Sequence, residues 1–277
     1  MLLTDRDWNA EWMQLQKARE WDDTPEYWNG RSAEFAKCAR QSSYAERFLE
    51  YAAIPAGATV LDVGCGPGTL TLPLARSGHQ VTAIDFADGM LARLEEQASR
   101  EGLAGIRTVK AGWEDDWGAF GIDCADVAVA SRSIATPDLG AALEKLHLAA
   151  RQKVCLTVAA GSSPRHDARI FKALGREYAP EFGHVYCMNI LFRMGVMPEL
   201  RYVRSEKPEF FDSREMARVS VQRMVGSVQP HEEKRLEQYL AEHLVRVTPF
   251  TGNELWTWEQ PRAVTWAFIS WKTSRQV

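Results

Sequence analysis

Cysteine is scarce and scattered in this sequence of 277 residues. The cysteines are odd in number and form no C-x-x-C pair: Cys38, Cys65, Cys124, Cys155 and Cys187. This pattern predicts neither a disulfide framework nor a zinc site. Reduced thiols are typical of the cytoplasm, and we expect this protein to act there.

Long apolar runs and an excess of positive charge are also absent. The sequence contains no stretch of the roughly 18 apolar residues that a membrane-spanning helix needs, and Asp5, Arg6 and Asp7 interrupt its start as no signal peptide would. The formal net charge is −4, without the broad positive field typical of nucleic-acid binding. No H-E-x-x-H or EF-hand motif occurs, so no bound metal is expected. These absences favour a small-molecule partner over nucleic acid or membrane.

The sequence does contain a regular alternation of short apolar runs with amphipathic helices. Parallel strands need helical crossovers between them, so this alternation predicts a doubly wound α/β sheet. The expected strands are 58–63, 80–85, 106–110, 126–131 and 153–159, and the expected helices between them are 69–77, 88–101 and 138–151.

Two further segments flank this core within one expected domain, 1–277. Residues 1–53 are rich in aromatic side chains and predict a helical cap before the core, 54–160. The remainder, 161–277, predicts two strands that complete a mostly parallel seven-stranded sheet, with helical insertions that form either a substrate lid or plain packing. Its expected strands are 199–205 and 263–271, and its expected helices are 166–178, 184–194, 213–225 and 231–245.

A glycine-rich turn follows the first apolar strand of the core, in the stretch Val60-Leu61-Asp62-Val63-Gly64-Cys65-Gly66-Pro67-Gly68. Glycine permits positive φ and lets a ligand approach bare backbone, and the helix that follows presents unpaired N–H groups. A dinucleotide fingerprint, G-x-G-x-x-G, would need a third glycine where Thr69 stands. A nicotinamide oxidoreductase therefore stays only as an alternative.

The D-x-G-C-G-x-G pattern after an apolar strand resembles motif I of the class I S-adenosylmethionine-dependent methyltransferases, and the resemblance covers residues 58–160. It implies a Rossmann-like fold and S-adenosyl-L-methionine as cofactor, with S-adenosyl-L-homocysteine as product. It further implies that Asp62 addresses the amino end of the cofactor, directly or through water. The residues that it places around the methionine moiety are Gly64, Cys65, Gly66 and Gly68.

Asp85 ends the second strand about 20 residues beyond the first glycine, where Rossmann-type sites keep an acid for the ribose hydroxyls. The family resemblance adds residues around the ribose, the adenine and the cofactor's ammonium group. Family members often carry an acid where this chain has Gly112, and Glu114 or Asp115 could replace it. The added residues are Phe86, Met90, Gly112, Trp113, Glu114, Ala130 and Ser131, with Trp28 and Arg31 contributed by the cap.

Methyl transfer is expected at the exit of the fourth strand, because ligands of open α/β sheets bind beyond the carboxyl ends of the strands. The [DN]-P-P-[YF] sequence of amide and base-nitrogen methyltransferases is absent there, and Arg132 would face the substrate. In-line displacement on an activated methyl group needs positioning and no dedicated base. If a proton must leave, the candidate bases are His166, His184 and Tyr186.

We therefore expect S-adenosylmethionine-dependent methylation of a small molecule. The alternatives are a methyltransferase that acts on protein or RNA, and a cofactor-binding protein without chemistry.

Overall fold

The structure, a computed structural model, describes residues 6–18, 24–39, 43–134, 136–248 and 254–273. The chain separates into two compact units. Unit 1 comprises Met1–Val158, Gly183–Val203 and Ala267–Val277, and unit 2 comprises Ala159–Phe182 and Arg204–Trp266.

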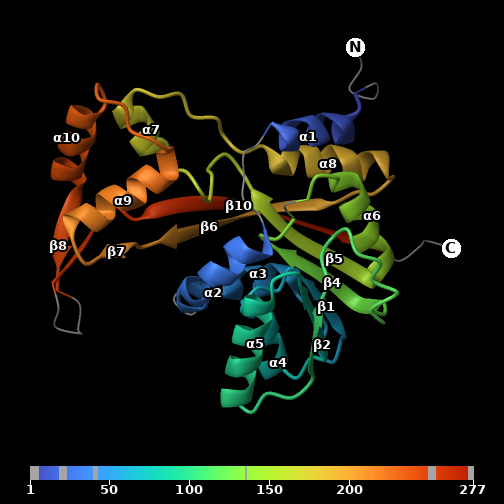
Figure 1. The fold of residues 1–277 in the computed structure, drawn as a ribbon. Coiled ribbons are helices and arrows are strands. Elements are labelled where there is room, and N and C mark those ends of the chain that lie inside the picture. The colour runs from blue at the N-terminus through green and yellow to red at the C-terminus, as the bar shows by residue number, and fades with distance from the viewer. Residues whose placement is uncertain (1–5, 19–23, 40–42, 135, 249–253, 274–277) are drawn as a thin grey trace. The chain divides into compact units, whose positions relative to one another are not determined.

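A seven-stranded sheet carries the α/β fold, in the order β3-β2-β1-β4-β5-β10-β6 (Figure 1). The pairs β1–β2, β2–β3, β1–β4 and β4–β5 are parallel. Every strand predicted from the sequence forms, and the two late strands complete the sheet as predicted. The bounds are β1 Val60–Val63, β2 Val81–Asp85, β3 Ile106–Lys110, β4 Ala125–Ser131, β5 Ala150–Ala159, β6 Glu199–Lys207 and β10 Arg262–Lys272.

The central strands are mostly apolar and are buried on both faces, because helices cover both sides of the sheet. All of β1 is buried, and Val127, Ala128, Val129 and Ala130 of β4 have no exposed surface. In Figure 1, α1, α6 and α8 lie on one side of the sheet and α3, α4 and α5 on the other. The helices of unit 1 are α1 Trp8–Lys17, α2 Pro25–Ala39, α3 Tyr44–Ala52, α4 Thr71–Arg76, α5 Asp88–Arg100, α6 Leu139–Ala149 and α8 Gly183–Arg193.

The predicted N-terminal cap consists of α1, α2 and α3. Helix α2 packs against α5, and α1 packs against α6 and α8. Two side chains of α1 fix it to the loop before α6: the Trp12 indole donates to the Thr136 carbonyl at 2.9 Å, and the Asn9 amide donates to Asp138 at 2.9 Å. The cap is thus attached to the segment that follows β4.

Unit 2 contains α7 Ala168–Leu174, α9 Arg214–Val225 and α10 Glu233–His243, with a small antiparallel sheet in the order β7-β9-β8. These elements share their own buried core, which includes Ile170, Leu174, Val221, Leu236 and Leu240. The sequence did not predict the small sheet. Its strands, β7 Phe210–Phe211, β8 Leu244–Val247 and β9 Leu255–Trp258, are too short to show a clear alternation, and 244–245 were assigned to a helix that ends at His243.

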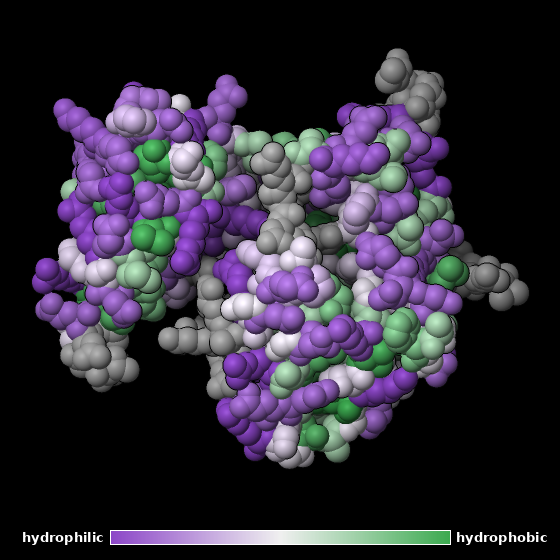
Figure 2. Space-filling model, viewed as in Figure 1, coloured by the Kyte–Doolittle hydropathy of each residue, from purple (hydrophilic) through white to green (hydrophobic). Residues whose placement is uncertain are grey.

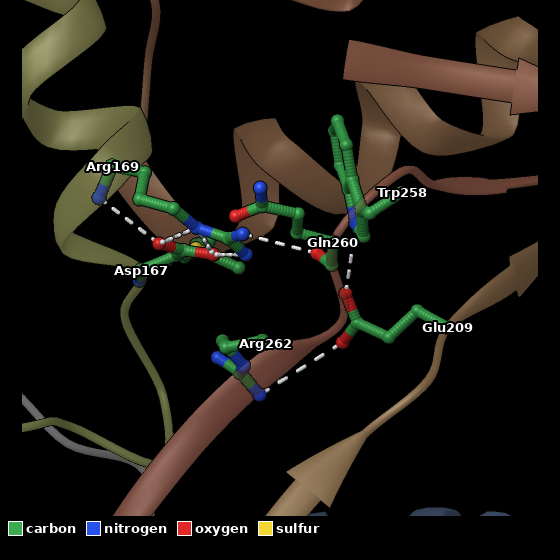
Figure 3. A network of polar contacts seen from close by, with 7 residues as sticks. Asp167, Arg169, Glu209, Trp258, Gln260 and Arg262 are labelled. Carbon is green, nitrogen blue, oxygen red and sulfur yellow. Dashed lines mark hydrogen bonds and ion pairs between the residues drawn. The ribbon is translucent and has the colours of Figure 1, made fainter.

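Polar contacts supplement the core of unit 2 (Figure 3). Asp167 caps α7 by accepting from the Arg169 backbone N–H, and it also pairs with the Arg169 guanidinium at 2.6 Å. Glu209 accepts from the Trp258 indole at 3.1 Å and lies 3.8 Å from the buried guanidinium of Arg262. A buried charge is costly unless a partner opposes it, so Glu209 stabilises Arg262 in this interior. A lid role for the helices between 161 and 260 stays a prediction.

The visible face of the molecule is mostly hydrophilic, with hydrophobic residues scattered over it (Figure 2). The lengths and hydropathy of the helices bear on membrane insertion. Within the described ranges, each helix is too short or too polar to cross a bilayer.

Candidate functional site

A pocket of about 550 Å³ lies in unit 1 at the carboxyl ends of the central strands. Val63 of β1, Asp85 of β2 and Ser131 of β4 all line it. Strand β1 pairs with β2 on one side and with β4 on the other, so the strand order reverses here. Ligands of open α/β sheets bind at such a reversal, where the crossovers leave a crevice.

Most residues singled out in the sequence meet in this pocket. The structure places the following among its lining residues: Trp28, Asp62, Gly64, Cys65, Gly66, Asp85, Phe86, Met90, Gly112, Trp113, Glu114, Ser131 and Arg132. Gly68, Ala130 and Arg31 are not among the lining residues that the structure describes. Gly68 and Ala130 lie against the protein interior instead, and the Arg31 guanidinium donates to the Tyr27 hydroxyl at 2.6 Å.

The three glycines of the loop after β1 have different physical requirements, although φ is positive at each. A Cβ on Gly64 would lie 2.3 Å from the Cβ of Ser133, so only glycine lets the β1 and β4 exits approach this closely. A Cβ on Gly68 would lie 2.6 Å from Leu94 Cδ1. At Gly66, by contrast, a Cβ would meet no heavy atom of the described residues within 4 Å. Gly66 is therefore the glycine whose bare backbone borders open pocket space.

Asp62 is a buried acid at the base of the pocket, with an exposed fraction of 1%. Its Oδ2 accepts from the Thr71 hydroxyl at 2.6 Å, while Oδ1 has no hydrogen-bond partner among the described residues. Burial raises the pKa of Asp62 to about 7, against the opposing hydrogen bond from Thr71 and with a smaller contribution from the charge of Asp85. An unpaired buried carboxylate oxygen is costly, and a cationic donor in the pocket would satisfy it.

Asp85 is held by backbone donors on both of its oxygens. Oδ2 accepts from Gly66 N–H and Oδ1 from Ala87 N–H, each at 2.9 Å. Burial raises the pKa of Asp85, while the hydrogen bonds from Ala87, Gly66 and Phe86 oppose that shift. A carboxylate oxygen has two lone pairs, so both oxygens keep capacity to accept from a diol.

The loop after β3 forms another wall and is fixed at several points. The Trp113 indole donates to the Ser133 carbonyl at 2.9 Å, and Asp115 accepts from Gly112 N–H at 2.7 Å. Glu114 accepts from the Thr136 hydroxyl at 3.1 Å. Both Glu114 and Asp115 line the pocket, so this loop supplies carboxylates even though Gly112 stands where the family often has an acid.

The exit of β4 presents Ser131, Arg132 and Ser133 to the pocket. The Ser133 hydroxyl donates to the Val63 carbonyl at 2.5 Å, which binds the β4 exit to the β1 exit. The serine therefore has a structural role beside its place in the lining.

The candidate bases lie elsewhere. Tyr186 and His184 are on α8, where the Tyr186 ring packs against two α1 rings, Trp8 at 5.8 Å and Trp12 at 5.7 Å between centroids. The His184 ring contacts Tyr202, and His166 belongs to unit 2, where it contacts Phe171. Of the four catalytic candidates, only Arg132 lines the described pocket.

Several lining residues were not predicted. They carry no motif, and several come from segments far from the glycine loop: Gln16, Pro25, Thr69, Leu70, Thr136 and Pro137. Thr71, which orients Asp62, was also missed. The start of a helix directly after the glycine turn was the available signal for it.

The residues present fit the S-adenosylmethionine that the resemblance implies. The unpaired Oδ1 of Asp62 suits an ammonium group, and Asp85 is positioned to accept from ribose hydroxyls. The open space beside Gly66 leaves room for a ligand against the backbone.

Comparisons with known proteins agree with this geometry. Residues 60–153 match the sequence model of a family described as "Methyltransferase domain". An uncharacterized protein of Haemophilus influenzae is 30% identical over 256 residues, which cover 91% of this chain and 90% of that protein. A 23S rRNA (uracil(1939)-C(5))-methyltransferase of Alkalilimnicola ehrlichii is 28% identical over 165 residues, 53% of this chain and 35% of that enzyme.

Among solved structures, a putative methyltransferase from Bacillus halodurans has the same fold with a TM-score of 0.53. It is 15% identical in sequence, and the match covers 84% of this chain and all (100%) of that one. The fold, the pocket and the sequence matches agree, and the chain belongs to the class I S-adenosylmethionine-dependent methyltransferases.

Proposed function

We propose that this methyltransferase transfers the methyl group to a small-molecule acceptor. The supporting observation is the composition of the pocket wall: the N-terminal helical segment contributes Gln16, Pro25 and Trp28 beside the glycine loop. In this proposal a small acceptor shares the pocket of about 550 Å³ with the cofactor. The net charge of −4 also opposes binding to a polyanion.

The cofactor is held, in this proposal, by groups that the structure orients in advance. Asp62 pairs with the ammonium group through Oδ1, and the backbone at Gly64 and Gly66 borders the methionine moiety. Asp85 accepts from the ribose hydroxyls. Around the base lie Phe86, Met90, Gly112 and Trp113, and Glu114 accepts from the adenine amino group in place of the absent acid.

Catalysis then rests on positioning. The cofactor supplies a methyl group that its sulfonium already activates. The protein holds the acceptor atom in line with that group, and such positioning can lower a barrier by about 7–11 kcal/mol. His166, His184 and Tyr186 lie outside the described lining, so the proposal assigns no proton transfer to them.

The proposal also ranks an RNA acceptor below a small molecule and assigns the protein a cellular location. The rRNA methyltransferase of Alkalilimnicola ehrlichii matches over only 35% of its own length, so it gives little support for an RNA acceptor here. We assign the protein to the cytoplasm, in keeping with the free thiols of Cys65, Cys124, Cys155 and Cys187.

The proposal is tested by tracing a labelled methyl group. The enzyme and S-adenosylmethionine with a labelled methyl group are incubated in three separate reactions. One contains the small metabolites of a bacterial extract, one its total RNA and one its total protein. We expect label only in dialysable products, with far less from an Asp85→Ala variant at the same cofactor concentration. Label confined to RNA or protein would contradict the small-molecule assignment, and absence of label with normal cofactor binding would favour a non-catalytic protein.

Cofactor binding is expected to depend on the ionisation of Asp62. Only the carboxylate pairs with an ammonium group, and the pKa of this acid is about 7 in the free protein. The affinity for S-adenosylhomocysteine should therefore fall by up to about tenfold for each pH unit below 7. Titration calorimetry between about pH 5.5 and 8, a range that brackets this pKa, measures how steeply the affinity changes with pH. In the Asp62→Asn variant the affinity should change much less with pH. An equal slope in both proteins would contradict the assignment.

The same shift affects stability with the opposite trend. The folded protein keeps the Asp62 proton between the ordinary pKa of 3.8 and about 7, whereas the unfolded chain releases it. Stability falls with pH wherever the folded state binds more protons. The contribution of Asp62 to the cofactor-free protein should thus decline as pH rises through this window.

A further inference from the structure

Arg132 has a backbone conformation that is costly for its residue type. Its φ is 60°, and among the described residues other than glycine only Ala53, which caps α3, also has positive φ. Such a conformation persists when the surroundings impose it, and strained residues of this kind cluster at binding and catalytic sites. Here the Arg132 N–H donates to the carbonyl and the hydroxyl of Thr157 on β5, at 3.3 and 3.1 Å.

The guanidinium of Arg132 also packs on an aromatic ring. Its Cζ lies 4.2 Å from the ring centroid of Tyr44, which is buried and belongs to α3. The Tyr44 hydroxyl hydrogen-bonds to Ser131 at 2.9 Å and to Thr157 at 2.5 Å. Tyr44, itself held by β4 and β5, thus restrains the Arg132 side chain, and this restraint reduces the entropy that is lost when the guanidinium binds a ligand.

The charge balance of the pocket makes this cation distinctive. The described lining includes four acids, Asp62, Asp85, Glu114 and Asp115, and Arg132 is the one Lys or Arg in that set. Arg31, which the sequence analysis assigned to the cofactor, donates to Tyr27 and lies outside the described lining. A carboxylate that enters this acidic pocket therefore has one strong partner, and planar guanidinium groups suit carboxylates.

We propose that Arg132 is the receptor for a carboxylate in the pocket. Two ligands could bring that group, the methionine end of the cofactor or the acceptor. The second source rests on the proposed function, because it makes the acceptor a carboxylic acid. The sources differ in one measurable respect, since only the first involves the cofactor's own amino-acid tail.

The test compares two cofactor-derived probes by calorimetry. S-adenosylhomocysteine carries the amino-acid tail, and 5′-methylthioadenosine lacks it. If the cofactor supplies the carboxylate, Arg132→Met weakens the binding of S-adenosylhomocysteine by about tenfold or more and leaves the affinity for 5′-methylthioadenosine unchanged. Arg132→Lys, which keeps the charge without the planar fork, should lose less. Arg151→Gln removes an exposed arginine on β5 and is the matched control.

A second arm addresses the acceptor. Protein saturated with S-adenosylhomocysteine is mixed with 4-fluorobenzoate, and binding is followed by broadening of the fluorine NMR signal. If the acceptor supplies the carboxylate, wild-type protein broadens the signal, Arg132→Met does not, and both bind S-adenosylhomocysteine equally.

The proposal is overturned if Arg132→Met matches wild type with all three probes. It is also overturned if Arg132→Met and Arg132→Lys each lose the same affinity for S-adenosylhomocysteine as for 5′-methylthioadenosine, because Arg132 would then only maintain the shape of the pocket. Failure of wild-type protein to bind S-adenosylhomocysteine would instead contradict the cofactor assignment itself.

Discussion

Replacing Asp85 with alanine is expected to weaken the affinity for S-adenosylhomocysteine by about 100-fold. The variant loses the acceptors for the ribose hydroxyls, and each hydrogen bond to a charged group contributes about 1.5–3 kcal/mol. It also releases the N–H groups of Gly66 and Ala87, which the carboxylate now holds at 2.9 Å each. The glycine loop therefore loses its anchor together with the ligand contact. Titration calorimetry measures the change in dissociation constant.

Asp88 offers a matched control three residues further along the chain. Its side chain is 65% exposed and pairs with Lys110 at the surface. Asp88→Ala should leave cofactor affinity unchanged, because the residue does not belong to the described lining. The affinity of Asp85→Asn should lie between those of the wild-type and Asp85→Ala proteins, since the amide keeps one acceptor oxygen. Equal affinity of wild-type and Asp85→Ala proteins would refute the ribose role.

Replacing Gly64 with alanine should destabilise the fold by about 3 kcal/mol. The added Cβ would lie 2.3 Å from the Cβ of Ser133, and φ at Gly64 is 67°. Separation of the β1 and β4 exits would relieve the clash, at the cost of the bond from Ser133 to the Val63 carbonyl. The free energy of unfolding in urea measures the effect.

Substitutions at two other glycines separate the steric clash from the backbone strain as causes of the lost stability. Gly78 has φ 83° and no described heavy atom within 4 Å of a Cβ, so Gly78→Ala should cost only about 1–2 kcal/mol of backbone strain. Gly66→Ala should be similarly mild for stability but should impair cofactor binding, because its methyl group would occupy open pocket space. If Gly64→Ala were no more destabilising than Gly78→Ala, the close approach to Ser133 would not limit the fold.

Local patterns predicted the sheet and the center of the pocket. Asp62 and Asp85 each lie on a buried strand, and parallel strands place their carboxyl ends at one edge, so the two acids had to converge. The glycine spacing marked the loop between them. In these cases the sequence signal and the physical requirement lie within the same few residues.

The remaining features depend on contacts between distant segments. Gln16 of the N-terminal segment and Thr136, which follows β4 inside the cofactor-binding core, line the same pocket, and no periodicity indicates that. Amphipathicity predicted α8 but not that Tyr186 would pack against Trp8 and Trp12. Arg31 and Arg132 both suited an anion by residue type, and only the tertiary structure shows which one reaches the pocket lining.

The attachment of α1 bears on the order in which the enzyme matures during synthesis. Trp12 and the carbonyl that it contacts are 124 positions apart, and Asn9 and Asp138 are 129 apart. A nascent chain emerges from its amino end, so the first helix leaves the ribosome well before its partners exist. The attachment of α1 beside the cofactor pocket can be completed only after translation has passed residue 138. The aromatic residues of α1 stay exposed for longer, because Tyr186, which packs against Trp8 and Trp12, is synthesised later still.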